Sequence, residues 1–246
     1  MSVRKFSFAP FSERPRLSGP EESRRHAPER SGRHAICFGW DNSPSTYING
    51  GQEEIKEGVR RFSQQMRADP RLAGRVDVSV WAFTDSAETK CYVDSRPAEG
   101  LQMPELPTSA STPLYGLYAD IIEHAITERN ARQAECDVDI ASTWIFVLSD
   151  YWANDPGRRH RALEARDRSL EEGINVFLLL AGENPDSAIA EELAHPSRRP
   201  MAMRGVKDFV NFFDFVSDSL SLKARSVAGQ VLLLEDLTGK PMRAEG

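Results

Sequence analysis

The stretch "AICFGWDNSPS" (residues 35–45) passes from an apolar run to a polar turn within one short segment. The run "AICFGW" (35–40) has the length and composition of a buried strand. The polar residues that follow it, Asp41, Ser43 and Ser45, occupy alternate positions. Alternate residues of an extended segment point to the same side. The stretch therefore predicts a buried strand whose carboxyl end presents one carboxylate and two hydroxyls together.

The chain beyond this stretch alternates between strand and helix patterns. Apolar spacing and composition predict further strands at 75–83, 88–94, 142–150, 174–181 and 200–203, and helices at 51–70, 113–131, 157–173, 185–194 and 206–226. The strand segments "STWIFVLSD" and "INVFLLLA" are apolar almost throughout. Continuous apolar strands are typical of parallel sheets that are covered on both faces. We therefore predict an α/β fold with a doubly wound, mostly parallel sheet flanked by helices.

The two ends of the chain differ from this central pattern. Within residues 1–33, the stretch "RPRLSGPEESRRHAPERSGR" is rich in Arg, Pro, Ser and Glu and poor in large apolar residues. Such a composition predicts a flexible basic arm, either a solvated tail or a docking segment for a partner. Residues 34–226 form the predicted α/β domain. Residues 227–246 form a C-terminal extension, in which "QVLLLEDL" has strand composition and either joins an edge of the sheet or docks on a partner.

Composition narrows the functional classes. The 246 residues suffice for one large α/β domain with extensions, and the net charge of −6 gives no general attraction to nucleic acid or to an anionic membrane. No apolar stretch approaches the roughly 20 residues of a membrane span, and no apolar signal core follows the basic N-terminus. The three cysteines are widely spaced and odd in number, which favours reduced thiols. We expect a cytoplasmic protein.

Oxygen-bearing side chains follow two of the predicted strands and precede one helix. Asp41 follows the first strand, Asp150 ends the strand at 142–150, and Thr112 stands before the helix at 113–131, with Ser111 as the alternative. The carboxyl ends of parallel strands meet at one edge of a sheet. Hard oxygen donors without Cys or His suit Mg²⁺ or Mn²⁺ and disfavour zinc or copper. We predict such a metal site, with one coordination position left open for a carboxylate from outside.

These motifs resemble those of the von Willebrand factor A (vWA) family. "DNSPS" matches the family's D-x-S-x-S motif, "ASTPLYGL" its threonine loop and "FVLSD" its later aspartate, in the family's order and over about residues 34–226. The stretches "GVRRFSQQMRADP", "VWAFTDSAET" and "FVNFFDFVSDSLS" are most similar to the bacterial TerY-like branch. The resemblance implies a doubly wound sheet and a metal-ion-dependent adhesion site (MIDAS) whose metal bridges to an acidic residue of a protein partner. Its residues would be Asp41, Ser43, Ser45, Thr112 and Asp150.

The chain departs from the family pattern at two positions. Tyr151 stands where most members have glycine, and Pro44 replaces the glycine between the two serines. Pro44 removes one amide donor but leaves both serine hydroxyls in place. We expect Tyr151 and Trp152 to form an aromatic contact surface for a partner at the rim of the site. Asp155, which precedes Pro156, is interpreted as a turn residue, with a supporting role beside the site as the alternative.

The function predicted from these features is a non-enzymatic, metal-dependent protein-interaction module. By resemblance, its partners would include a protein kinase or phosphatase in a bacterial stress, tellurite-resistance or phage-defence system. One alternative is a Mg²⁺-dependent phosphohydrolase, but Ser43 stands where the second acid of such an enzyme is expected. The other alternative is a degenerate vWA scaffold without metal. No nucleophile and base pair is recognisable, so we predict that the protein is not an enzyme.

Overall fold

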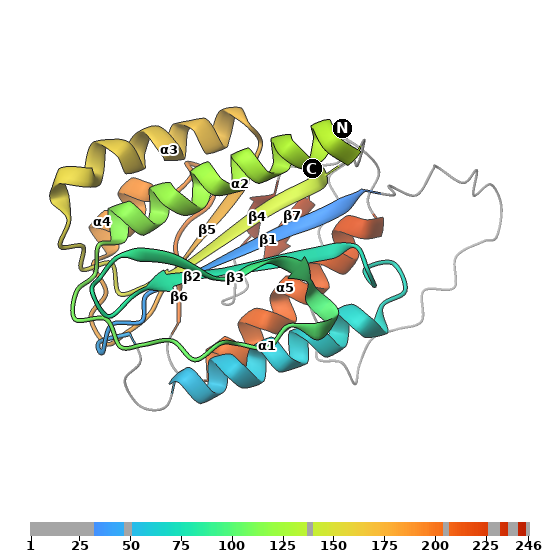
Figure 1. Cartoon of the computed structure of the whole chain (residues 1–246), viewed down its shortest axis with the longest axis horizontal. Helices are drawn as coiled ribbons and strands as arrows, with labels where there is room; N and C mark the ends of the chain where they lie inside the picture. Colours follow the sequence, from blue (N-terminus) through green and yellow to red (C-terminus); the bar gives the residue numbers. More distant parts are fainter. Residues whose placement is uncertain are drawn as a thin grey trace.

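The computed structural model describes residues 32–46, 51–136, 140–203, 207–225, 232–235 and 241–244. The predicted N-terminal arm lies outside these residues except for its last two positions, and the first strand already begins at Arg33. Figure 1 shows one central sheet with helices on both sides. None of the helices in the described part of the chain is both long and apolar enough to cross a lipid bilayer.

Six strands form the main sheet in the order β3-β2-β1-β4-β5-β6. All neighbouring pairs are parallel except β2 and β3, which are antiparallel. Helices join β1 to β2, β4 to β5 and β5 to β6, and the strand order runs outward in opposite directions from the neighbouring strands β1 and β4. The predicted doubly wound fold class is therefore confirmed. The strands are β1 (Arg33–Trp40), β2 (Val76–Phe83), β3 (Thr89–Pro97), β4 (Ile140–Ser149), β5 (Asn175–Leu180) and β6 (Met201–Ala202).

The helices lie where the apolar spacing predicts them. The largest difference is at α2, which runs five residues beyond its predicted end. The long helices are α1 (Gly51–Ala68), α2 (Leu114–Cys136), α3 (Arg159–Glu171) and α5 (Lys207–Arg225), and the short ones are α4 (Ser187–Leu193) and the 3-10 turns η1 (Ala98–Gly100) and η2 (Pro156–Arg158).

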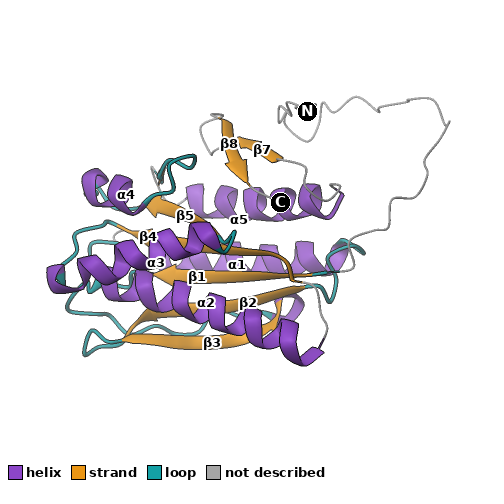
Figure 2. Ribbon diagram, turned by 90° about the horizontal axis from the view of Figure 1, so that it is seen from above, coloured by secondary structure: helices purple, strands orange, loops and turns teal. Residues whose placement is uncertain are grey.

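The C-terminal extension forms a separate hairpin. β7 (Leu232–Glu235) pairs with β8 (Pro241–Ala244) in an antiparallel two-stranded sheet. Figure 2 shows this hairpin apart from the main sheet. The predicted strand in "QVLLLEDL" therefore exists, but it pairs with β8 and does not join an edge of the main sheet.

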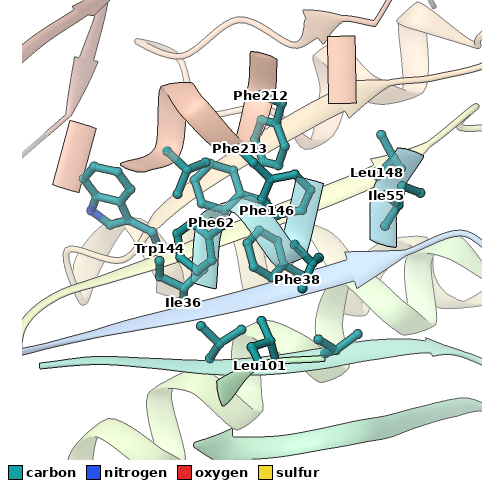
Figure 3. Packing of buried hydrophobic residues seen from close by; sticks show 14 of the residues in the cluster. Ile36, Phe38, Ile55, Phe62, Leu101, Trp144, Phe146, Leu148, Phe212 and Phe213 are labelled. Carbon is teal, nitrogen blue, oxygen red and sulfur yellow. The ribbon is translucent and has the colours of Figure 1, made fainter. Parts of the chain in front are cut away.

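The two faces of the sheet are covered by different helices. In Figures 1 and 2, α1 and α5 lie on one face, and α2, α3 and α4 lie on the other. Alternation along β1 serves both layers, because Ile36, Phe38 and Trp40 pack with α1 and α5 whereas Cys37 packs with α2. Figure 3 shows the aromatic centre of the first layer, where side chains of β1, β4, α1 and α5 meet. The sheet is thus fixed from both sides, and its carboxyl edge is a rigid base for the loops.

The contact between α1 and α5 depends on a glycine. A Cβ atom at Gly58 would lie 2.3 Å from Cδ2 and 2.8 Å from Cε2 of Phe213, whose ring is fully buried. Alanine would gain about 0.5–1 kcal/mol of helix stability over glycine, but overpacking of a tight core costs about 1–3 kcal/mol. We expect Gly58→Ala to lower the free energy of unfolding, measured by urea denaturation, by about 1 kcal/mol.

The matched control is Gly100→Ala, since a Cβ atom there meets nothing within 4 Å. This variant should unfold at the wild-type urea concentration or slightly above it. A Gly58→Ala protein as stable as Gly100→Ala would contradict the close packing of α1 on α5.

Candidate functional site

The two aspartates of the predicted site follow neighbouring strands. Asp41 comes directly after β1 and Asp150 directly after β4, and these strands pair in parallel with Trp40 opposite Leu148. The pairing continues one residue past β1, where the backbone N–H of Asp41 donates to the carbonyl of Leu148 over 2.8 Å. Both carboxylates are buried. The structure therefore brings Asp41 and Asp150 to one edge of the sheet, as the sequence predicts.

The Asp41 carboxylate is held by two hydrogen bonds from uncharged donors. Its Oδ1 accepts from the backbone N–H of Ser43 over 2.9 Å, and its Oδ2 accepts from Oγ of Ser149 over 2.6 Å. Burial raises the pKa of Asp41, the hydrogen bonds from Ser149 and Ser43 oppose that rise, and the charge of Asp150 adds to it. Asp41 is thus fixed by hydrogen bonds. In the described part of the chain, no cationic side chain is shown to pair with its negative charge.

The serine turn gathers three hydroxyls beside Asp41. Oγ of Ser43 lies 3.2 Å from Oγ of Ser45 and 3.4 Å from Oγ1 of Thr46, so the predicted convergence of the two serines is confirmed. The loop after β5 approaches the same turn closely. At Gly182, where φ is +90°, a Cβ atom would lie 3.3 Å from the carbonyl of Ser45 and 3.4 Å from Cβ of Asp150. Ser45 and Asp150 therefore both lie close to Gly182.

Asn42 anchors the loop that carries Thr112, a role that its sequence context did not indicate. Its buried side chain accepts from the N–H of Phe83 over 2.9 Å and donates to the carbonyls of Phe83 and Pro107 over 2.7 and 2.6 Å. Its own carbonyl accepts from the N–H of Ser109 over 3.1 Å. Asn42 thus joins the end of β1 to the end of β2 and to the threonine loop. A single sequence offers no signal for this role, because an asparagine in a polar turn satisfies local groups just as readily.

The loop after Asp150 is tied to the same threonine loop. The backbone N–H of Asn154 donates to the carbonyl of Thr112 over 3.1 Å, and the side-chain amide of Asn154 contacts Oγ of Ser111 at 2.6 Å. Asp155 then accepts from the N–H groups of Tyr115 and Gly116 over 3.1 and 2.8 Å. Asp155 is therefore more than the turn residue that the sequence suggested, because it satisfies two amides in the first turn of α2.

Tyr151 is not part of an exposed rim, and that prediction is wrong. Its side chain is fully buried, and its hydroxyl donates to the carbonyl of Val147 over 2.9 Å. Its backbone is in the left-handed region with φ of +62°, a conformation that costs a residue with a side chain on the order of 1 kcal/mol. This conformation turns the ring down into the core. Trp152, in contrast, is 60% exposed, and its contact with a partner stays a prediction.

Two oxygen atoms at this edge have no partner within the described residues. Oδ1 of Asp150 accepts from the N–H of Trp152 over 3.1 Å, but no hydrogen bond between described groups engages Oδ2 of Asp150 or the hydroxyl of Thr112. The described ranges also contain no cluster of three or more His, Cys, Asp or Glu side chains that could hold a metal. The donors gathered here are two carboxylates with hydroxyls, a set whose chemistry fits a hard cation such as Mg²⁺.

Comparison with family models and with curated proteins gives no match. Among solved structures, the D319A mutant of the PilB minor pilin from Streptococcus sanguinis is similar, with a TM-score of 0.54, 8% identity, and coverage of 80% of this chain and 64% of that one. Proximal thread matrix protein 1 from the mussel byssus has the same TM-score and 12% identity, with coverage of 77% and 48%. The chain thus spans less than two thirds of the length of these structures.

These likenesses concern the fold alone, an α/β fold with a mostly parallel sheet between helices. The ArnB paralog VWA2 from Sulfolobus acidocaldarius matches less well, with a TM-score of 0.46, 14% identity, and coverage of 76% of this chain and 45% of that one. The TerY-like branch stays a prediction from the sequence motifs.

The contact of Asp155 with the start of α2 can be tested by substitution. Asp155→Ala leaves the N–H groups of Tyr115 and Gly116 without their acceptor. Loss of a helix-capping acceptor costs about 1 kcal/mol. We expect urea denaturation, followed by circular dichroism, to show a loss of about this size.

Asp155→Asn should retain part of the lost stability, because its amide oxygen still accepts one hydrogen bond. The control is Glu164→Ala on α3, whose side chain is 63% exposed. If Asp155→Ala were as stable as this control, the loop after Asp150 would not be anchored on α2.

Proposed function

We propose that this protein is a non-enzymatic interaction module that binds a protein partner through a divalent cation, Mg²⁺ or Mn²⁺. The observation that carries the proposal is the gathering of two buried carboxylates, Asp41 and Asp150, with the hydroxyls of the serine turn at one edge of the sheet. In the described residues no hydrogen bond engages Oδ2 of Asp150 or the hydroxyl of Thr112, so both atoms can take further partners. A bound cation and its waters would supply them.

The proposed ligand set is Asp41, Ser43, Ser45, Thr112 and Asp150. Two buried carboxylates at one edge repel each other, and the pKa of Asp41 is raised by burial and by the charge of Asp150. A cation between them would favour the ionised form of both groups. The short contact between the serine hydroxyls places two neutral oxygens beside the carboxylates. When bound, the metal would supply a positive charge with an open position, which a carboxylate of the partner completes.

The biological setting of the proposal rests on the resemblance of the motifs to the TerY-like branch. That resemblance supports a cytoplasmic role in a bacterial stress, tellurite-resistance or phage-defence system. It also supports a protein kinase or phosphatase as the partner that offers the acidic residue.

Metal binding is the first test of the proposal. We expect titration calorimetry to detect one Mg²⁺ or Mn²⁺ per chain at or below millimolar concentration. Asp41→Ala and Asp150→Ala should each abolish the signal, because each removes a charged oxygen donor. Glu164→Ala, which removes an exposed carboxylate on α3, should bind as the wild type does.

A bound metal should also raise the melting temperature, by an amount that grows with the logarithm of the metal concentration above its Kd, since it binds the folded state alone. If the wild-type chain binds neither ion at millimolar concentration, even with an acidic peptide present, the scaffold is degenerate and the proposal fails.

The second test concerns catalysis. The residue two positions after Asp41 is Ser43, whose hydroxyl contacts Ser45 and Thr46, and it provides no second acid for phosphoryl transfer. We expect no hydrolysis of p-nitrophenyl phosphate, nucleotides or a casein substrate above background in the presence of Mg²⁺. Asp41→Asn is the control that identifies any turnover belonging to this site. Turnover in the wild type that this variant loses would replace the interaction module with an enzyme.

A further inference from the structure

Trp152 is the large hydrophobic residue that the described part of the chain leaves exposed, with 60% of its surface open. A single exposed hydrophobic side chain is ordinary on a protein surface and by itself indicates nothing. Trp152 differs because its backbone N–H donates to Oδ1 of Asp150 over 3.1 Å. The exposed indole is therefore linked by one hydrogen bond to a carboxylate of the proposed metal site.

The indole ring is also held in place. Its Nε1–H donates to the carbonyl of Asn184 over 2.7 Å, in the loop that follows β5. This bond satisfies the polar atom of the side chain, so the remainder of the exposed ring is an apolar surface. A tryptophan that is fixed before binding loses little conformational freedom when a partner covers it.

The preceding residue sets the direction of Trp152. Tyr151 points into the core, where its hydroxyl bonds to the carbonyl of Val147, and its backbone N–H donates to Oγ of Ser149 over 2.9 Å. With Tyr151 buried and in the left-handed region, the next side chain is directed outward beside the site. The aromatic contact surface thus consists of one ring and not of the pair that the sequence suggested.

We propose that Trp152 is a docking anchor that selects a particular kind of partner segment. The segment carries an Asp or Glu that completes the metal shell and, within one or two residues of it, an aliphatic or aromatic side chain that packs on the indole. This inference rests on the proposed metal-dependent function and specifies the partner for the same site.

Charge around the anchor makes the two contacts depend on each other. The carboxylates of Asp41 and Asp150 lie at the same edge, and Glu183 and Asn184 are exposed in the loop that holds the indole. Without a cation this surface repels an acidic segment. With the cation present, the partner carboxylate is attracted, and the neighbouring apolar side chain is brought over the ring. Apolar segments without an acid gain only the weaker of the two contacts.

The inference can be tested without knowing the natural partner. A phage-displayed library of random linear peptides is selected on the full chain in Mg²⁺, and binding of the best peptide is measured by fluorescence anisotropy. We expect enriched peptides to pair an acidic residue with an apolar residue within two positions and to dissociate in EDTA. Trp152→Ala should weaken the best peptide about 30-fold, in the range of an aromatic anchor, and Trp152→Phe should retain most of the affinity.

A double-mutant cycle then identifies the contact. Peptides in which the apolar residue is replaced by alanine should bind wild type and Trp152→Ala equally, whereas Glu164→Ala should bind the parent peptide as wild type does. Unchanged Mg²⁺ binding by Trp152→Ala in calorimetry would show that the effect lies in the partner contact. Enrichment without the acidic and apolar pair, or no coupling in the cycle, overturns the inference while leaving the metal-dependent function intact. A wild-type chain that binds no metal overturns both.

Discussion

Burial of the Asp41 carboxylate at the junction of β1 and β4 is the constraint around which this end of the molecule is organised. An ionised carboxylate inside a protein is costly unless hydrogen bonds or opposite charges compensate it. Here the compensation comes from Ser149 at the end of the neighbouring strand and from the amide of Ser43 in the following turn. Parallel pairing of β1 with β4 is what places the first of these donors. The register of the sheet therefore determines how Asp41 is hydrogen-bonded and so the geometry of the candidate site.

The loops around this carboxylate are joined to one another by polar side chains and not by apolar packing. Asn42 connects the ends of β1 and β2 with the threonine loop, and Asn154 and Asp155 connect the loop after β4 with that same loop and with α2. Hydrogen bonds have defined directions, so such connections fix loop positions more closely than hydrophobic contact of similar strength would. The hydroxyls and carboxylates at this edge accordingly lie on a stiff framework.

The fold, and the position of Asp41 and Asp150 at one edge of the sheet, could be predicted from the sequence because both depend on local patterns. Apolar runs mark buried strands, and polar residues directly after them lie at the carboxyl edge whatever the rest of the chain does. The supporting contacts of Asn42 and Asp155 span some 40 residues in the chain, between groups that no periodicity links. The orientation of the Tyr151 side chain could not be predicted from the sequence for another reason. A left-handed backbone is not expected for tyrosine, and only this conformation sends the ring inward.

Tyr151 also determines how this edge can respond to a ligand. Any rearrangement of the loop after Asp150 that changes the backbone of Tyr151 must draw a fully buried ring out of the core or break its bond to Val147. Such a movement would be as costly as opening part of the hydrophobic core itself. The loop is therefore suited to recognition of a preformed shape, with association limited by encounter and not by a slow change of conformation. A glycine in the same place would have no buried ring to withdraw, so the loop could also change its conformation on binding.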